Sequence, residues 1–133
     1  MKFSIVANPK HAKVKKVLTE VIGFVKDFDL EEETAKIVNL KGNPIDQLKG
    51  DVVISLGGDG TLLYILNKLN KPVFGINCGG VGFLTEIEQS DNLFNAIKRL
   101  QTKSYEIQKL DRIDAFLNGL HVGTALNEVV LHS

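Results

Sequence analysis

One short stretch of the chain, residues 55–63, places a single carboxylate, Asp59, among three glycines. Glycine permits positive φ and close backbone approach, and free N–H groups at the start of a following helix favour phosphate. The phosphate-binding candidates in this turn are Gly57, Gly58, Gly60 and Thr61. Asp59 repels phosphate, but it can accept a proton from a hydroxyl or hold a Mg²⁺ ion that phosphate also binds. Together these residue types predict phosphoryl transfer to an alcohol. A tight turn in which Asp59 only caps the helix is the alternative, because short glycine motifs have low specificity.

Two further stretches place candidate ligand-binding residues beside predicted strands. Residues 75–86 contain four more glycines, and Phe83 among them can present its ring to a base or a nicotinamide. A place in the core is the alternative for this phenylalanine. In residues 125–131, Asn127 and Glu128 can bind ribose hydroxyls through an amide and a carboxylate. An exposed polar pair at the start of a strand is the alternative there.

Composition and missing motifs exclude several other classes. The 16 basic residues balance 16 acidic ones, so no basic surface for nucleic acid is expected. No apolar run reaches the ~18 residues of a membrane span. One cysteine, Cys78, allows no internal disulfide and suggests a packing role, which fits a reducing, cytoplasmic compartment. The chain has neither a P-loop G-x-x-x-x-G-K-[ST] motif nor a G-x-G-x-x-G motif after its first strand. The three histidines lack metal-ligand spacing.

The elements that must position these residues follow an alternating pattern. Apolar runs predict strands at residues 3–7, 51–56 and 71–77. Helical spacing of apolar residues predicts a helix that runs from Val14 through Val25 to Phe28. Further helices are expected at residues 60–70 and 91–102, the second capped by Ser90, whereas residues 31–40 are ambiguous between strand and helix. Asn118-Gly119 between two β-like runs predicts a hairpin.

This alternation predicts an α/β fold, a mainly parallel sheet flanked by helices with a β-rich tail at the C-terminal end. We expect an α/β nucleotide-binding domain over residues 1–110. Residues 111–133 are expected to begin a β-rich segment or domain. Ligands of open α/β sheets bind beyond the carboxyl ends of the strands, where the glycine turn is expected to lie.

The three polar stretches together resemble the NAD kinase family. The family carries a GGDGT motif, a G-x-N-x-G-x-[LV]-G-F-L-T segment and an A-L-N-[DE]-[VI] segment in this order, matched here by residues 57–61, 75–85 and 125–129. Residues 8–10, Asn-Pro-Lys after the first strand, also look like the family. The GGDGT turn alone is shared with lipid kinases and phosphofructokinases, so the second and third motifs carry the specificity.

The resemblance implies transfer of the γ-phosphate of ATP, or a phosphate of polyphosphate, to the adenosine-ribose 2′-hydroxyl of NAD, with Mg²⁺ accompanying the donor. It implies that Asp59 is the catalytic acid/base and that Asp59 and Gly60 contact NAD. It also places Asn127 and Glu128 on NAD and Phe83 near it. A cytoplasmic homo-oligomer, dimer or tetramer, is implied for the full-length protein, without nucleic-acid or membrane partners.

Two departures from the family pattern leave alternatives open. Tyr64 stands where many members carry arginine or another basic residue that helps to hold NAD or phosphate. The chain stops at Ser133, whereas family members continue through a β-rich domain that completes the NAD site, so this chain alone is expected to be inactive. The alternatives are a related lipid or sugar kinase with the same turn and a non-catalytic nucleotide-binding fragment.

Overall fold

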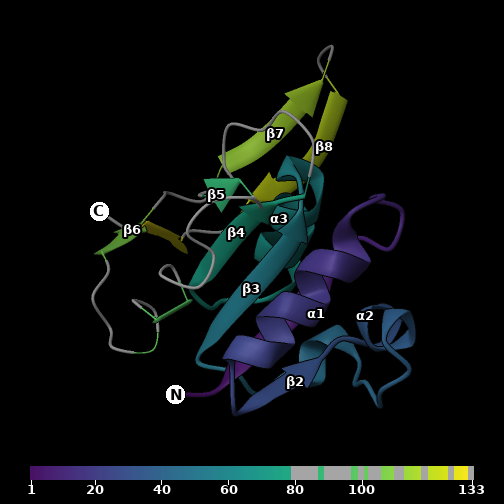
Figure 1. Cartoon of the computed structure of the whole chain (residues 1–133). Helices are drawn as coiled ribbons and strands as arrows, with labels where there is room; N and C mark the ends of the chain where they lie inside the picture. The colour runs from purple at the N-terminus through teal and green to yellow at the C-terminus, as the bar shows by residue number, and fades with distance from the viewer. Residues whose placement is uncertain are drawn as a thin grey trace.

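The structure, a computed structural model, describes residues 1–78, 87–88, 97–98, 101, 106–109, 113–117, 120–125 and 128–131. Strands and helices alternate through the first part of the chain (Figure 1). In chain order the elements are β1 (Phe3–Ala7), α1 (Val14–Phe24), β2 (Phe28–Leu30), α2 (Glu32–Ile37), the 3-10 helix η1 (Ile45–Gln47), β3 (Val52–Gly57), α3 (Asp59–Lys68), β4 (Val73–Asn77), β5 (Ile87–Glu88), β6 (Glu106–Lys109), β7 (Ile113–Leu117), β8 (Leu120–Ala125) and β9 (Glu128–Leu131).

The main sheet is built around parallel strands. Its order among the described residues is β2-β1-β3-β4-β9-β6, and β5 also pairs with β4. Strands β2, β1, β3 and β4 are parallel to their neighbours, as is β9 to β4, whereas β6 runs antiparallel to β9. The strands near residues 51–56 and 73–76 therefore lie parallel and in the interior of the sheet, and the predicted α/β class with a mainly parallel sheet is confirmed.

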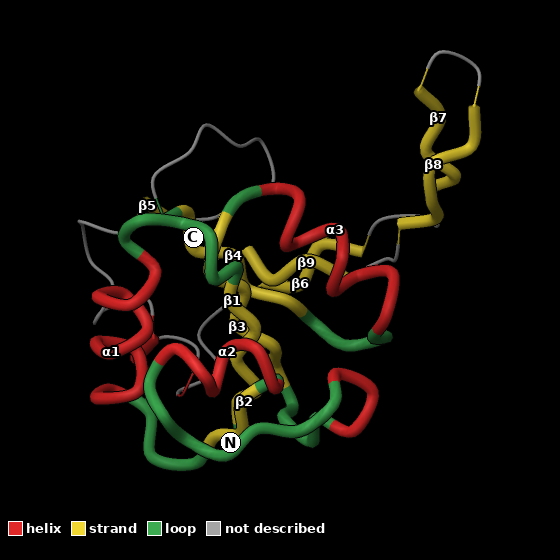
Figure 2. The backbone as a smooth tube through the Cα atoms, turned by 90° about the vertical axis from the view of Figure 1, so that its right-hand side faces the viewer, coloured by secondary structure: helices red, strands yellow, loops and turns green. Residues whose placement is uncertain are grey.

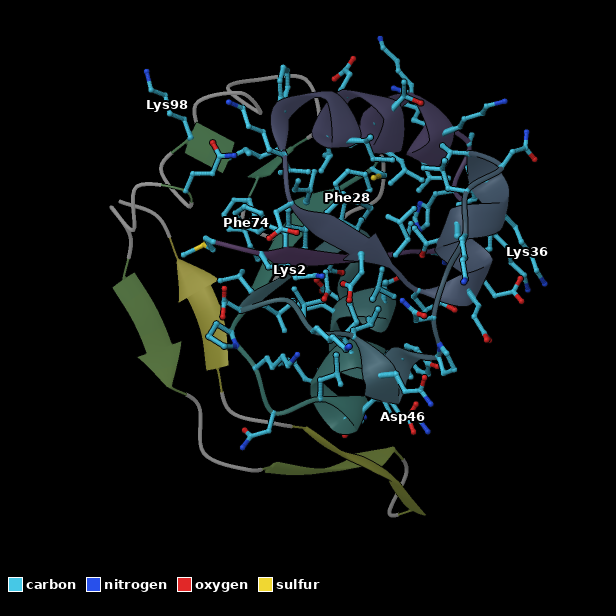
Figure 3. All side chains as sticks on the ribbon, turned by 90° about the horizontal axis from the view of Figure 1, so that it is seen from below. Lys2, Phe28, Lys36, Asp46, Phe74 and Lys98 are labelled. Carbon is cyan, nitrogen blue, oxygen red and sulfur yellow. The ribbon has the colours of Figure 1, made fainter. Side chains whose placement is uncertain are left out.

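Both faces of the parallel strands are covered, which explains why β1 and β3 are apolar almost throughout and completely buried. Helix α1 covers one face and α3 the other (Figure 2). Successive residues alternate between these layers: Ile5 and Ile54 belong to the α1 core, and Val6 belongs to the α3 core. Seen from below, Phe74 lies inside the protein while Lys36 and Lys98 project outward (Figure 3).

The first predicted helix is shorter than its apolar spacing indicates. Helix α1 ends at Phe24, because Val25 has an extended backbone (φ −100°, ψ 142°). Phe28 was wrongly assigned to this helix, since it begins β2 and pairs in register with Phe3. The apolar spacing continued past the helix because Val25 and Phe28 pack onto the same core as its buried face. Within residues 31–40, the ambiguous segment, residues 32–37 form α2.

Two buried serines in neighbouring strands have different environments. Ser4 Oγ donates to Asp29 and accepts from the backbone N–H of Gly50 at 2.8 Å. A Cβ atom on Gly50 would lie 2.3 Å from the backbone nitrogen of Ser4, so only glycine fits there. Ser55 Oγ is buried without a hydrogen-bond partner among the described residues. Its hydroxyl therefore contributes no hydrogen bond to offset its burial.

The C-terminal part is β-rich, as expected. Strands β7 and β8 form a separate antiparallel pair, which confirms the hairpin on either side of residues 118–119. Of the helix expected at residues 91–102, the described residues 97–98 and 101 are helical, and Ser90 lies outside the described residues. The domain boundary near residue 110 stays a prediction. None of the helices in the described ranges has the length and apolar content that crossing a membrane requires.

Candidate active site

The candidate site lies where the strand order of the sheet reverses. From β1 the chain crosses to β2 on one side and then returns to β3 on the other side of β1. The carboxyl ends of β1 and β3 are therefore adjacent, with Ala7 opposite Leu56. The N–H of Asn8 donates to the carbonyl of Leu56 at 2.9 Å, which ties the two loops together. A reversal of this kind leaves a crevice that open α/β proteins use for ligands.

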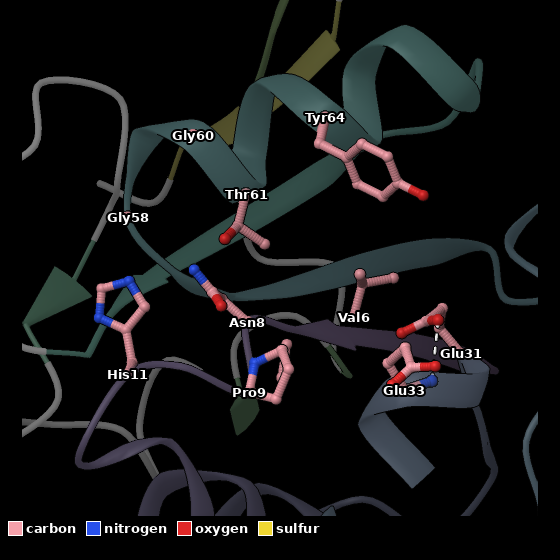
Figure 4. Close-up of a pocket in the computed structure, with 11 residues that line it drawn as sticks. Val6, Asn8, Pro9, His11, Glu31, Glu33, Gly58, Gly60, Thr61 and Tyr64 are labelled. Carbon is pink, nitrogen blue, oxygen red and sulfur yellow. Dashed lines mark hydrogen bonds between the residues drawn. The ribbon is translucent and has the colours of Figure 1, made fainter. Parts of the chain in front are cut away.

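A cavity of about 440 Å³ occupies this crevice. Its volume falls within the range of roughly 300–1,000 Å³ that is typical of small-molecule sites. Figure 4 shows Gly58 and His11 at one end, and Tyr64, Glu31 and Glu33 at the other. The residues that line the cavity are Val6, Ala7, Asn8, Pro9, His11, Glu31, Glu33, Gly58, Gly60, Thr61 and Tyr64.

The N-terminus of α3 forms the first end of the cavity. Gly58 is the N-cap residue, and in the described part of the chain no side chain caps it by hydrogen bonding. The carbonyl of Gly58 accepts from the N–H of Leu62 at 3.2 Å, which closes the first turn. The N–H groups of that turn have no acceptor within the helix, and the helix dipole gives this end a partial positive charge. The first turn is therefore suited to an anion.

The glycines of this turn serve by being small, not by adopting positive φ. None of Gly57, Gly58 and Gly60 has a backbone in the left-handed region, so the turn does not use the positive φ that glycine permits. A Cβ atom on Gly57 would lie 2.6 Å from Thr61 Oγ1, so this glycine lets the helix start directly against β3. Gly58 and Gly60 have open space where a side chain would stand. A ligand can therefore approach their backbone closely.

The loop after β1 supplies the facing wall. Asn8 Oδ1 accepts from the N–H of Lys10 at 3.0 Å, and the carbonyl of Asn8 accepts from the N–H of His11 at 3.2 Å. These bonds fold the Asn-Pro-Lys segment into a turn that holds half-buried His11 at the cavity. From the sequence, this segment was only a family likeness, and no role was predicted for His11. Its position directly after the first strand was the available signal.

A hydrogen-bond chain fixes the second end of the cavity. Strand β2 ends at Leu30, and its pairing with β1 ends there too. Beyond that point, the N–H of Ala7 in β1 donates to the hydroxyl oxygen of fully buried Thr34 at 2.8 Å. Thr34 in turn donates its hydroxyl proton to Glu31 Oε1 at 3.0 Å. The Glu31 carboxylate also caps α2, accepting from the N–H groups of Glu33 at 2.9 Å and Thr34 at 3.1 Å. No pattern in the sequence indicates that these two glutamates lie near the glycine turn.

The predicted catalytic residue lies beside the cavity. Asp59 is half-buried and opens α3, between two residues that line the cavity, although it is not itself a lining residue. Its carboxylate therefore occupies the first turn of the helix, where a negative charge is favourable. Tyr64 lines the cavity and is 48% exposed, with Lys68 Nζ 5.9 Å from its ring centroid.

The remaining predicted site residues are Phe83, Asn127 and Glu128. Phe83 and Asn127 lie outside the described residues. Glu128 opens β9, and the next residue, Val129, pairs with Val73 at the start of β4. The backbone of Glu128 is thus placed toward the amino end of β4, whereas the glycine turn follows the carboxyl end of β3.

The Cys78 thiol lies in the core and does not line the cavity. Burial raises the pKa of the Cys78 thiol to about 11, so the thiol stays protonated and acts as a packing residue. The N–H of Cys78 donates to the carbonyl of Gly57 at 3.0 Å, which links β4 to the glycine turn. Within the described residues, no three carboxylate, histidine or cysteine side chains gather as a dedicated metal site would require.

Sequence comparisons identify relatives along the whole chain. A profile of the ATP-NAD kinase N-terminal domain matches residues 25–105. The NAD kinase of Thermoplasma acidophilum is 37% identical and is matched by 100% of this chain over 50% of its own length. The NAD kinase of Chlorobium phaeobacteroides is 36% identical, with 98% of this chain and 50% of that protein covered. The chain thus spans about half the length of the curated relatives it matches.

Solved structures agree with this fold. Yeast NADH kinase complexed with NADH superposes on 96% of this chain and 46% of its own, with a TM-score of 0.72 at 14% identity. An NAD kinase from Archaeoglobus fulgidus in complex with ATP gives a TM-score of 0.50 at 27% identity, covering 82% of this chain and 41% of its own. The first similarity, at this low identity, establishes the fold alone.

Proposed function

The chain belongs to the NAD kinase family, and from this premise we propose that the full-length protein phosphorylates the adenosine-ribose 2′-hydroxyl of NAD to give NADP. The observation that carries the proposal is the position of residues 57–61. They form the N-terminus of a helix at the switch point of the sheet, with a carboxylate beside an anion-suited cavity. ATP is the proposed donor, supported by the ATP complex of the A. fulgidus relative. Polyphosphate is the second candidate donor, since it presents the same phosphate group to the helix.

The proposed phosphate site is the first turn of α3. Open backbone at Gly58 and Gly60, together with the Thr61 hydroxyl, offers hydrogen-bond donors to the transferring phosphate. Donors aimed at a phosphate stabilise the charge that spreads over its oxygens during transfer. Gly57 contributes by letting the helix begin against β3.

Asp59 is the proposed general base. The 2′-hydroxyl loses its proton to the Asp59 carboxylate while its oxygen bonds to the γ-phosphorus. The bond from that phosphorus to the bridging oxygen breaks, and ADP leaves. Asp59 flanks the cavity without lining it, so donor and acceptor can approach the first turn of the helix from different sides.

Mg²⁺ is proposed to enter with the donor. A single carboxylate beside a phosphate site fits this ion, which commonly binds through one or two carboxylates, substrate phosphates and water. Asp59 is the described carboxylate nearest in sequence to the phosphate site, and the ion would supply charge neutralisation there.

The NAD side of the proposal rests on the sequence motifs. We assign NAD contacts to Asp59, Gly60, Phe83, Asn127 and Glu128 because they match the family segments. The proposal extends to a cytoplasmic homo-oligomer without nucleic-acid or membrane partners, consistent with the balanced charge and the single, buried cysteine.

The test is NADP formation by the full-length gene product with ATP and Mg²⁺. NAD, NADH and a diacylglycerol are offered separately as acceptors, and phosphorylated products are identified by mass spectrometry. We expect NADP from NAD and no lipid phosphate. Phosphorylation of the lipid with none of NAD would replace this function with that of the related lipid kinases.

A further inference from the structure

The cavity is longer than a phosphate site requires, and its two ends differ in chemistry. One end is the amino terminus of α3, with Gly58 and His11 nearby (Figure 4). The other end carries an aromatic ring, Tyr64, and two carboxylates, Glu31 and Glu33. The proposed transfer of phosphate uses only the first end.

We propose that the end formed by Tyr64, Glu31 and Glu33 is a nucleoside subsite for the phosphate donor, so that the protein favours a nucleoside triphosphate over inorganic polyphosphate. This inference rests on the proposed function, because it takes the first turn of α3 as the place of the transferring phosphate. It names the residues that would choose between the two donors left open above.

Helix geometry places Tyr64 one step beyond the phosphate site. Tyr64 follows Thr61 by three positions and Gly60 by four, so the three share one face of α3, roughly 5–6 Å apart between neighbours. All three line the cavity. A group joined to the far end of a phosphate chain held at Gly60 and Thr61 would therefore reach the tyrosine ring.

The ring of Tyr64 is suited to a base. It is 48% exposed, so its face is accessible to a ligand. Lys68 Nζ lies 5.9 Å from the ring centroid, so a cation of the same helix lies within cation–π distance of the ring. Aromatic rings that line a cavity bind bases by stacking, with little dependence on which base is present.

The two carboxylates are suited to ribose hydroxyls and unsuited to phosphate. Glu31 is held in place by three hydrogen bonds, from Thr34 Oγ1, Thr34 N–H and Glu33 N–H. A carboxylate has about four acceptor positions, so one remains for a ligand hydroxyl. Glu33 Oε1 pairs with Lys36 at 3.0 Å, which leaves its second oxygen available to a donor group. A polyphosphate chain extending into this end would instead meet like charge.

The experiment measures binding of ATP and of inorganic tripolyphosphate to the full-length gene product by titration calorimetry, at equal Mg²⁺ concentration. We expect ATP to bind more tightly. Tyr64→Ala should weaken ATP by roughly five- to tenfold, at the low end of base stacking because the ring is half exposed, and leave tripolyphosphate unchanged. Tyr64→Phe, which keeps the ring, should retain most of the ATP affinity.

The carboxylates are tested by Glu33→Gln, with Glu32→Gln as the matched control. Glu32 carries the same charge in the same first turn of α2 but does not line the cavity. Glu33→Gln should tighten tripolyphosphate by roughly two- to fivefold, as expected when one solvent-exposed like charge is removed. Glu32→Gln should leave the ratio of the two affinities within twofold of the unmodified protein.

Equal affinity for ATP and tripolyphosphate in the unmodified protein would overturn the subsite, as would an equal loss of both in Tyr64→Ala. Failure of the proposed function is a separate result. If the expected binding pattern is observed but the full-length gene product forms no NADP, the nucleoside subsite is supported and the proposed NAD kinase activity is refuted. If NADP forms equally fast from ATP and polyphosphate, and Tyr64→Ala leaves that ratio unchanged, the subsite alone is wrong.

Discussion

Thr34→Val should destabilise the fold far more than one lost hydroxyl usually does. Thr34 is completely buried, and its oxygen is the acceptor for the N–H of Ala7 at 2.8 Å. Valine has nearly the same shape but no acceptor, so the Ala7 N–H becomes a buried donor without a partner. An orphaned buried donor costs roughly 1–3 kcal/mol, and the lost bond to the Glu31 carboxylate adds about 1 kcal/mol. We expect a loss of ~2–4 kcal/mol in the free energy of unfolding.

The measurement is urea unfolding followed by circular dichroism, with extrapolation to zero denaturant. Thr19→Val is the matched control, because the hydroxyl of Thr19 is exposed and bonds only to the Lys15 carbonyl of its own helix. Its effect should stay within about 0.5 kcal/mol. Thr34→Ser keeps both hydrogen bonds and should lose only about 0.8 kcal/mol for the missing methyl group. If Thr34→Val is no less stable than Thr19→Val, the Ala7–Thr34–Glu31 chain does not hold α2 to β1.

Four further outcomes are expected. In the full-length protein, Asp59→Asn should lower NADP turnover ~10²–10⁴-fold without unfolding it, and unchanged turnover would leave Asp59 a capping residue. Gly57→Ala should lower the free energy of unfolding by ~1–3 kcal/mol through the clash with Thr61. Gly23→Ala, on an open helix surface, should raise it by ~0.5–1 kcal/mol, and the same sign for both would refute the steric argument. Ser55→Ala should leave stability equal or ~1 kcal/mol higher, while Ser4→Ala lowers it, a contrast that thermal unfolding would reveal. Because the 133-residue chain spans about half the length of its curated relatives, the chain alone should form negligible NADP in a coupled assay, and rapid turnover would contradict this.

The fold followed from the sequence where local patterns decided it. The strands near residues 3–7, 51–56 and 73–77 are short and almost wholly apolar, as buried parallel strands must be. The end of α1 did not follow, because Val25 and Phe28 continue the apolar spacing of the helix, whereas Val25 is an extended loop residue and Phe28 belongs to a strand. The spacing of apolar residues shows which core a side chain joins, but it does not show the backbone conformation. Here a helix and the extended residues after it pack their side chains onto the same core.

Only the glycine-turn end of the candidate site was predictable from the sequence. The glycine turn was visible because glycine, aspartate and threonine between a strand and a helix carry their chemistry locally. Glu31 and Glu33 were not visible, since they reach the turn only through the crossover from β2 and the bond of Thr34 to Ala7. Tyr64 was noticed as a departure from the family, but its place in a shared cavity required the structure.

The strand order also governs how the chain can fold. Strand β1 finds its neighbours in β2 and β3, and β3 finds its next neighbour in β4, so paired residues lie at least 20 positions apart in the chain. No pairing in this part of the sheet can begin from a tight turn, and the entropy of closing each loop must be lost before any ladder forms. Such non-local topologies fold slowly, in contrast to the microseconds of a hairpin. During synthesis, β1 must remain without its central partner until residue 57 has left the ribosome. The glycine turn at residues 57–61 therefore emerges from the ribosome just as the first half of the sheet becomes able to close.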